Sequence, residues 1–532
     1  MPSCNHHIQK LIDHSHSLTE ICNIIRQNYC KCTTKENYKI NRKYFAVKTC
    51  FEVQLNDLDD PLNSTILVSF NGGNKKPIED VMFIISNLPL ISREYETCIK
   101  LSIIDCKIKM SPRDVNTLAS KYASFLEFIF YHFPNVTSFE IKSYYNDSYF
   151  HNFPIYVLEK LVSDQIEEIS YIELFSLLNY GKEFNLLDSE IFDNKSNLNK
   201  FFFYADINKF SYTRENFNNE LDAFLKLLSK HKHITYSFSI ALNDLSMKIA
   251  YKIAEYCEEN TIHFQFCFCK PITGVSYFDY FDLDENVLQI KSYITCIKMY
   301  LREFKCFKKL EIALSSLEEL ESIIINIDYN FTAYVVKEFG NCKNFFRKLD
   351  NNIFLRIVTK NLKKLEISFI ENQDINKKEI KHYDKKSNKI LAKLLSYFPN
   401  SVRVIMFENI NKIEKFVFIQ MGFYFPQLET ITFKGINEIS DVACVKIKSL
   451  RNVIIYGELK IEIPPWIDIV IFRYCHCQNM LQYKTSDLKN IDYYFNLMNT
   501  KFDCSLQKID DGETVEIVFL RDVLNWNNFI KL

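Results

Sequence analysis

Three pairs of cysteines separated by one residue come closest to a reactive or metal-binding motif in this sequence. They are Cys30/Cys32, Cys267/Cys269 and Cys475/Cys477. A structural zinc site takes four ligands, and the paired Cys-x-x-Cys spacing that announces one is absent. Cys267 and Cys269 lie within an apolar run, so we expect them to be small core residues. The sequence therefore predicts no metal site and no cofactor.

The histidines and glycines do not form a catalytic motif either. The close pairs His14/His16 and His231/His233 lack the i, i+4 spacing that directs two ligands from one face of a helix. The nine glycines are not spaced as in a dinucleotide-binding loop, a P-loop or a nucleophile elbow. We predict that the chain is not an enzyme and has no catalytic residues. A cysteine–histidine pair that is distant in sequence stays open as an alternative, because such pairs have no local signature.

Lysines cluster between residues 360 and 386. Three flank the start of a strand-like stretch, and the others are Lys377, Lys378, Lys381, Lys385 and Lys386. Acidic residues are interspersed among them, namely Glu371, Asp374, Glu379 and Asp384. We interpret residues 371–388 as a solvated loop that leads into a helix, with a local phosphate-binding patch as the alternative.

Composition and charge indicate a folded protein with no global attraction to polyanions. The chain has 532 residues, of which 47% are hydrophobic and 25% charged, and its formal net charge is −1. This balance predicts no nucleic-acid partner, and no apolar run reaches the length of about 18 residues that a membrane span needs. The 17 cysteines are an odd number in strand-like segments, which suggests reduced thiols. We expect a cytoplasmic or nuclear protein.

One apolar pattern recurs along the chain and must organise it. In its clearest copy, Leu428, Ile431 and Phe433 follow a turn at Pro426. Related copies follow the Phe-Pro-Asn turns at residues 133–135 and 398–400. A variant keeps the letters Lys-Lys-Leu-Glu-Ile at 308–312 and again at 363–367, and the stretches 98–106 and 467–475 add a cysteine three residues after the last apolar position.

This spacing resembles the leucine-rich repeat, whose motif continues to an Asn or Cys at that position. The resemblance covers residues 98–478 and implies an α/β solenoid, a horseshoe of irregular repeats with a parallel sheet inside and helices outside. We expect parallel strands in one sheet at 101–103, 139–141, 365–367, 405–407, 431–433 and 453–455. Helices are expected at 113–132, 216–230, 246–258 and 386–397, whereas the repeats after Leu428 are too short to hold one. Within the strands, Leu365 and Ile431 should be core residues, and Glu366 and Thr430 should be exposed on the other side.

Two segments flank this array. Residues 44–97 contain alternating apolar stretches and are expected to form an irregular N-terminal capping module. Residues 479–532 are expected to form a C-terminal cap, because the last strand would otherwise expose an open edge.

Residues 1–43 form a small helical N-terminal segment in our interpretation. Ser17 and Glu20 fit a capping box, and apolar residues recur at helical spacing on either side. The pattern resembles the latter part of an F-box, although the opening Leu-Pro pair is missing. The resemblance to F-box/leucine-rich-repeat proteins implies a protein-interaction module that serves as substrate receptor of a cullin-type ubiquitin ligase. The adaptor would then contact Leu11, Ile12, Leu18, Ile21 and Ile25. The alternatives are that these helices cap the array, and that the protein is a binding scaffold with no ligase link.

Overall fold

A large, mainly parallel sheet forms the centre of the protein in the computed structural model. The structure describes residues 50–55, 66–70, 76–77, 82, 98–104, 112–133, 136–143, 153–205, 217–240, 244–268, 290–328, 330–339, 341–352, 359–370, 377–439, 444–457, 459, 461–475, 504–510 and 514–521. The predictions for residues 1–43, including those for Leu11, Ile12, Leu18, Ile21 and Ile25, concern residues outside these ranges.

Thirteen of the described strands form a continuous parallel series, in which neighbours in the sheet follow one another along the chain. They are β4 (Cys98–Ile104), β5 (Ser138–Ser143), β6 (Glu168–Glu173), β7 (Lys200–Ala205), β8 (Thr235–Ile240), β9 (Phe264–Phe268), β10 (Ile294–Leu301), β11 (Ser322–Asp328), β12 (Lys364–Ile370), β13 (Val404–Glu408), β15 (Thr430–Lys434), β17 (Asn452–Tyr456) and β18 (Ile469–Cys475). The six segments predicted to lie parallel in one sheet all belong to it, so that prediction is confirmed.

Both ends of this sheet continue into antiparallel strands. At one end β1 (Cys50–Leu55) pairs in parallel with β4 and antiparallel with β2 (Ile66–Phe70), which carries the short β3 (Lys76–Pro77). At the other end β20 (Thr514–Leu520) pairs antiparallel with β18, and β19 (Cys504–Asp510) pairs with β20. A separate two-stranded ladder joins β14 (Lys412–Ile413) to β16 (Glu438–Ile439).

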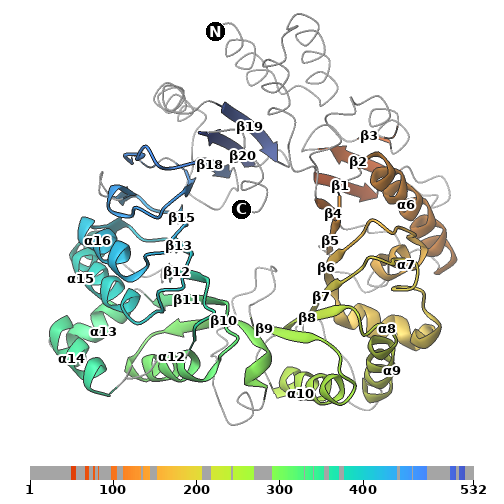
Figure 1. Cartoon of the computed structure of the whole chain (residues 1–532), viewed down its shortest axis with the longest axis horizontal. Helices are drawn as coiled ribbons and strands as arrows, with labels where there is room; N and C mark the ends of the chain where they lie inside the picture. Colours follow the sequence, from red (N-terminus) through yellow and green to blue (C-terminus); the bar gives the residue numbers. More distant parts are fainter. Residues whose placement is uncertain are drawn as a thin grey trace, which may run out of the picture.

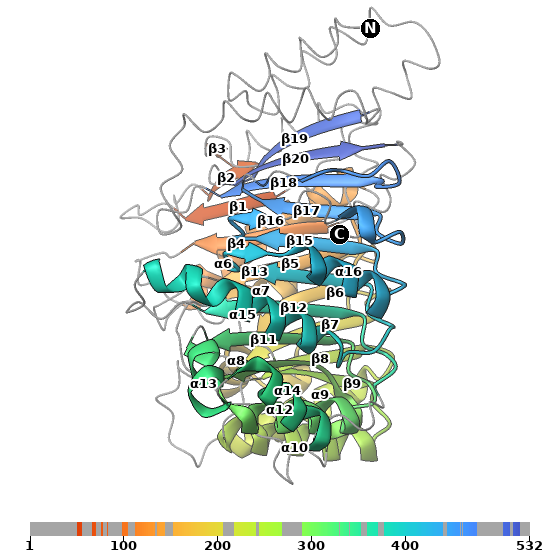
Figure 2. The same cartoon turned by 90° about the vertical axis from the view of Figure 1, so that its left-hand side faces the viewer.

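The helices lie on the outer side of the curved sheet (Figure 1). They are α6 (Pro112–His132), α7 (Phe153–Lys160), α8 (Leu174–Glu183), α9 (Phe217–Lys230), α10 (Asp244–Glu259), α12 (Phe304–Ser316), α13 (Asn330–Phe339), α14 (Cys342–Asn352), α15 (Lys377–Leu395) and α16 (Lys415–Tyr424). Figure 2 shows the strands stacked one above another, with helices such as α15 and α16 in front of them. We call the sheet face opposite the helices the inner face.

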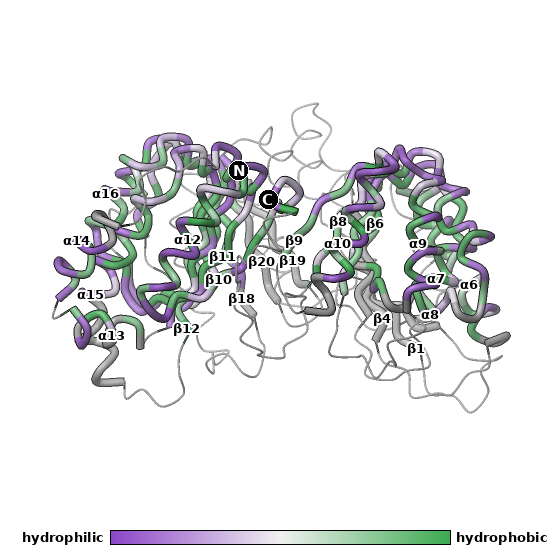
Figure 3. The backbone as a smooth tube through the Cα atoms, turned by 90° about the horizontal axis from the view of Figure 1, so that it is seen from below, coloured by the Kyte–Doolittle hydropathy of each residue, from purple (hydrophilic) through white to green (hydrophobic). Residues whose placement is uncertain are grey.

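The core lies between the sheet and the helices because apolar residues alternate along each strand. One register column shows this clearly, since all its members are fully buried: Ile323, Leu365, Ile405, Ile431, Val453 and Val470. In Figure 3 the strands near β11 are coloured mostly as hydrophobic, whereas the helices also carry hydrophilic stretches. The fold is therefore the mixed α/β fold that was expected.

Most predicted helices are confirmed, with one shift and one error. The segments at 113–132, 216–230 and 246–258 correspond to α6, α9 and α10. Helix α15 begins at Lys377, so the lysine-rich stretch is more helical than expected. The string at 308–312 was predicted as a repeat copy, which is wrong, because it lies inside α12. Between β15 and β17 the described residues hold a three-residue 3-10 helix, Cys444–Lys446, in agreement with the short repeat.

Candidate functional site

A row of side chains crosses the inner face from β10 to β18. Its members are register partners on consecutive parallel strands, and we call them the inner row: Tyr300, Asn326, Ser368, Glu408, Lys434, Tyr456 and Arg473. Each follows a core residue directly, as Lys434 follows the buried Phe433. Because neighbouring residues of a strand point to opposite faces, the inner row faces away from the helices. Adjacent members are one strand spacing apart, roughly 4.8 Å.

Polar contacts join members of the inner row at its C-terminal end. Lys434 Nζ lies 2.6 Å from a carboxylate oxygen of Glu408. On the next strand but one, Arg473 Nη1 donates a hydrogen bond of 2.9 Å to the hydroxyl of Tyr456. The Tyr456 ring also lies between two cations, with Lys434 Nζ 5.9 Å and the Arg473 guanidinium carbon 5.5 Å from its centroid. Both distances allow a cation–π attraction.

Electrostatics couple this end of the inner row to Glu366, which lies two residues before Ser368 in β12 and on the same face of the sheet. Burial raises the pKa of Glu366, and the nearby Glu408 carboxylate adds to the effect while Lys364 opposes it. Burial by itself would lower the pKa of Lys434, but its hydrogen bond to Glu408 and the charge of that carboxylate outweigh burial and raise it. The surface therefore holds charges of both signs in a half-buried setting, where their interactions are less screened than in water.

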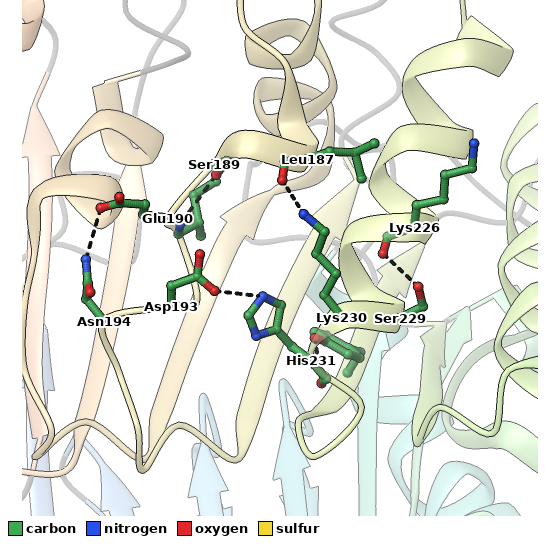
Figure 4. A network of polar contacts seen from close by, with 11 residues as sticks. Leu187, Ser189, Glu190, Asp193, Asn194, Lys226, Ser229, Lys230 and His231 are labelled. Atoms are coloured by element: carbon green, nitrogen blue, oxygen red, sulfur yellow. Dashed lines mark hydrogen bonds and ion pairs between the residues drawn. The ribbon is translucent and has the colours of Figure 1, made fainter.

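A second polar cluster lies between β6 and α9 and is shown in Figure 4. His231 Nε2 lies 3.2 Å from Asp193 Oδ1. Burial lowers the pKa of His231, and the pairing with Asp193 offsets this only in part. Lys230 donates to the backbone oxygen of Leu187, which ties the end of α9 to the 3-10 helix Leu186–Asp188. The ring of His233 also lies near that of His231, with 6.2 Å between the two centroids. The ion-pair partner of His231 is nevertheless the carboxylate of Asp193. The His-x-His pair does not form a two-ligand metal site by itself.

Lys195 belongs to the same cluster and is only 1% exposed. Its Nζ donates a 2.8 Å hydrogen bond to the backbone oxygen of Leu158 in the last turn of α7. Burial lowers the pKa of Lys195 to about 8, although Asp193 and Glu159 act against that shift. A lysine with a lowered pKa is a candidate nucleophile, yet this amine is held against a helix end and closed off from solvent. We assign it a structural role, because a cation at a helix C-terminus satisfies carbonyl groups that the helix leaves open.

The cysteines differ from the expectation in one respect. Cys267 lies in β9 between the buried Phe266 and Phe268, so it points to the inner face and is half-buried. The prediction that Cys267 is a core residue is therefore wrong, and the reason is strand alternation within an apolar run. Cys30, Cys32, Cys269 and Cys477 lie outside the described residues.

The repeat pattern predicted the strands that carry five members of the inner row, from Ser368 to Arg473, but not β10 and β11, which carry Tyr300 and Asn326. The pattern marks those five members as non-core positions, and nothing in its spacing indicates that Lys434 in β15 meets Glu408 in β13. No sequence pattern indicated that Lys195 is buried, because lysine is seldom buried in proteins. Thr430 was expected to be exposed, but it is 3% exposed and accepts a hydrogen bond from Asn452 Nδ2.

The described residues bear on two classes of site. They contain no group of three or more His, Cys, Asp or Glu side chains placed to hold a metal ion. Among the helices that the structure describes, none is both long and apolar enough to cross a membrane.

Comparison with known proteins gives a family but no activity. No curated protein matches this sequence. The family described as "Domain of unknown function (DUF8346)" matches residues 42–532, which is much more than half of the chain. The protein therefore belongs to that family of unknown function.

Proposed function

We propose that this protein is a leucine-rich-repeat-like solenoid, a horseshoe of irregular repeats, and that its inner face binds a protein partner. The observation that carries this proposal is the arrangement of Lys434, Tyr456 and Arg473 on the sheet face opposite the described helices. The apolar repeat spacing and the parallel order of the strands support the architecture.

The chemistry of the inner row favours a protein over a nucleic acid. Glu408 and Glu366 stand beside Lys434, so the surface offers no continuous positive potential for a phosphate backbone. Tyrosine and arginine are enriched at the energetic centres of protein interfaces, because each combines a broad contact area with hydrogen bonding. The half-buried donors and acceptors of Glu408, Lys434, Tyr456 and Arg473 would recognise a partner by polar complementarity, which contributes specificity and association rate.

A narrower form of the proposal is that the protein is a substrate receptor of a cullin-type ubiquitin ligase. It rests on the sequence pattern of residues 8–30 and on the resemblance of the repeats to F-box/leucine-rich-repeat proteins. In that form the inner face holds the substrate and the segment of residues 8–30 engages the adaptor. The alternative is a binding scaffold with no ligase link.

The proposal is tested by reversing charge on the inner face. The double variant Lys434→Glu/Arg473→Glu should lose the proteins that the wild-type chain retains in quantitative affinity purification. The matched control is Lys308→Glu/Lys415→Glu, which makes the same charge change at exposed positions of the outer helices α12 and α16. Equal retention by the wild type and the inner-face variant, with loss in the control, would overturn the proposal. Circular dichroism of all three proteins checks that the fold is kept.

A further inference from the structure

Strands β9 and β10 form an irregular joint in the sheet. Their pairing has three register partners, with a shift between Ile294 and Cys296, whereas the next joint, β10 with β11, has six regular ones. Figure 1 shows this joint at the bottom of the arc, between α10 on one side and α12 on the other. A short ladder holds its strands together with fewer backbone hydrogen bonds, so this joint should open more readily than its neighbour.

Two cysteines face each other across this joint. Cys267 of β9 and Cys296 of β10 are direct register partners. Each precedes a core residue, Phe268 and Ile297 respectively, so both side chains lie on the inner face, and both are half-buried. Register partners on adjacent strands have Cα atoms roughly 4.8 Å apart, which falls within the range of about 4.4–6.8 Å that disulfides span.

We propose that Cys267 and Cys296 form a reversible disulfide that staples β9 to β10. The oxidant is a small disulfide of the glutathione class. The thiolate of one cysteine attacks a sulfur of the oxidant, which forms a mixed disulfide and releases one small thiol. The thiolate of the second cysteine then attacks the protein sulfur of that mixed disulfide and releases the second small thiol. In sum, two protein thiols are oxidised to one S–S bond, and one oxidant disulfide is reduced to two thiols.

Other described cysteines are placed to stay reduced under the same conditions. Burial raises the pKa of Cys257 and that of Cys444 to about 12, so neither forms a thiolate readily at neutral pH. Cys306 and Cys342 are buried as well. The half-buried pair is reachable by a small disulfide, whereas these core thiols are not. The disulfide would restrain the joint between strands β4–β9 and strands β10–β18. It would thereby limit how far the inner face can bend at this joint.

The experiment incubates the full-length protein in glutathione buffers from reducing to oxidising, then blocks remaining thiols and maps the peptides by mass spectrometry. We expect a Cys267–Cys296 linked peptide in the oxidising buffers, and its loss in the reducing ones. Cys267→Ser and Cys296→Ser should each abolish that link. The variants Cys269→Ser and Cys257→Ser are controls, and both should retain it.

Hydrogen exchange supplies a second readout in the same samples. The amides of β9 and β10 should exchange several-fold more slowly in the oxidised wild type than in the reduced one, with no such difference in Cys296→Ser. The proposal is overturned if, in the most oxidising buffer, both cysteines of the folded protein are recovered as blocked thiols or as glutathione adducts. A link from Cys296 to Cys269 in place of Cys267 would overturn it equally.

Discussion

Leu310 and Leu365 occupy the same place in two identical pentapeptides, Lys-Lys-Leu-Glu-Ile, and both are fully buried, yet Leu310 lies in helix α12 and Leu365 in strand β12. The surrounding residues decide between the two conformations. Around Leu310 the buried positions follow helical spacing, with Phe307 and Leu314 on the same face. Around Leu365 they alternate, with Ile367 buried next and Glu366 between them.

The same pair of peptides provides a matched stability test. Ile367 is fully buried in the strand, whereas Ile312 is 38% exposed on the helix. Ile367→Ala should lower the free energy of unfolding by about 2–5 kcal/mol, the usual cost of emptying an aliphatic core site. Ile312→Ala should cost under about 1 kcal/mol, because little buried volume is lost. Urea denaturation measures both, and equal losses would contradict the assignment of the two peptides to different elements.

Lys195 should make the stability of the protein depend on alkaline pH. Its folded-state pKa of about 8 lies below the ordinary 10.5, so the unfolded chain holds more protons between these values and stability rises with pH across that window. The rise is on the order of 3 kcal/mol, at about 1.4 kcal/mol for each pKa unit. The methionine of Lys195→Met does not titrate. The unfolding free energy of the wild type minus that of the variant should therefore increase from pH 8 to pH 10.5. A constant difference would contradict the burial of this amine.

His231 predicts a second pH dependence, on the acidic side. Burial lowers the pKa of His231 from its ordinary 6.5, so the unfolded chain takes up its proton first as the pH falls. The stability that the neutral, buried imidazole confers is fully present above pH 6.5 and is lost below it. In His231→Gln the acid-induced decrease should be smaller than in the wild type. Thermal melts from pH 7.5 to pH 5 make the comparison, and an unchanged decrease in His231→Gln would refute the assignment.

The ligase form of the proposed function has its own test at the N-terminal segment. If residues 8–30 engage an adaptor, Leu18→Asp/Ile21→Asp should abolish adaptor binding and leave the melting temperature of the array unchanged, because a few apolar residues dominate such an interface. If the segment only caps the array, the wild type should not bind the adaptor and the variant should melt at a lower temperature. A pull-down beside a thermal melt separates the two cases.

Several strands and the helices α6, α9, α10 and α15 could be predicted because their signals are local. The alternation around Ile431 and the helical stripe of residues 113–132 each lie within one window of sequence, and both are confirmed. The helical conformation of residues 308–312 was missed because the pentapeptide Lys-Lys-Leu-Glu-Ile is the same in a helix and in a strand. The residues on either side of it decide the conformation. The members of the inner row are brought together by the register of the strand pairs. Register partners in this row are 17 to 42 residues apart in the sequence, so a short stretch of sequence does not contain both of them.

The burial of single polar residues was harder to predict for a related reason. Thr430 and Glu366 occupy the non-core phase of their strands, as expected, but Thr430 is buried and Glu366 is half-buried. Strand phase decides which face a side chain points to. It does not decide how much neighbouring strands cover that face, which depends on the sizes of the register partners.

The most direct measurement of the central claim is site-specific photo-crosslinking in cells that contain the partner. A benzophenone amino acid replaces Tyr456 on the inner face or, as the matched aromatic control, Phe423, which is 81% exposed on the outer helix α16. Binding through the inner face predicts a discrete covalent adduct with another protein from position 456, its loss when Lys434→Glu is added, and no such adduct from position 423. An adduct from position 423 with none from position 456 would contradict the account.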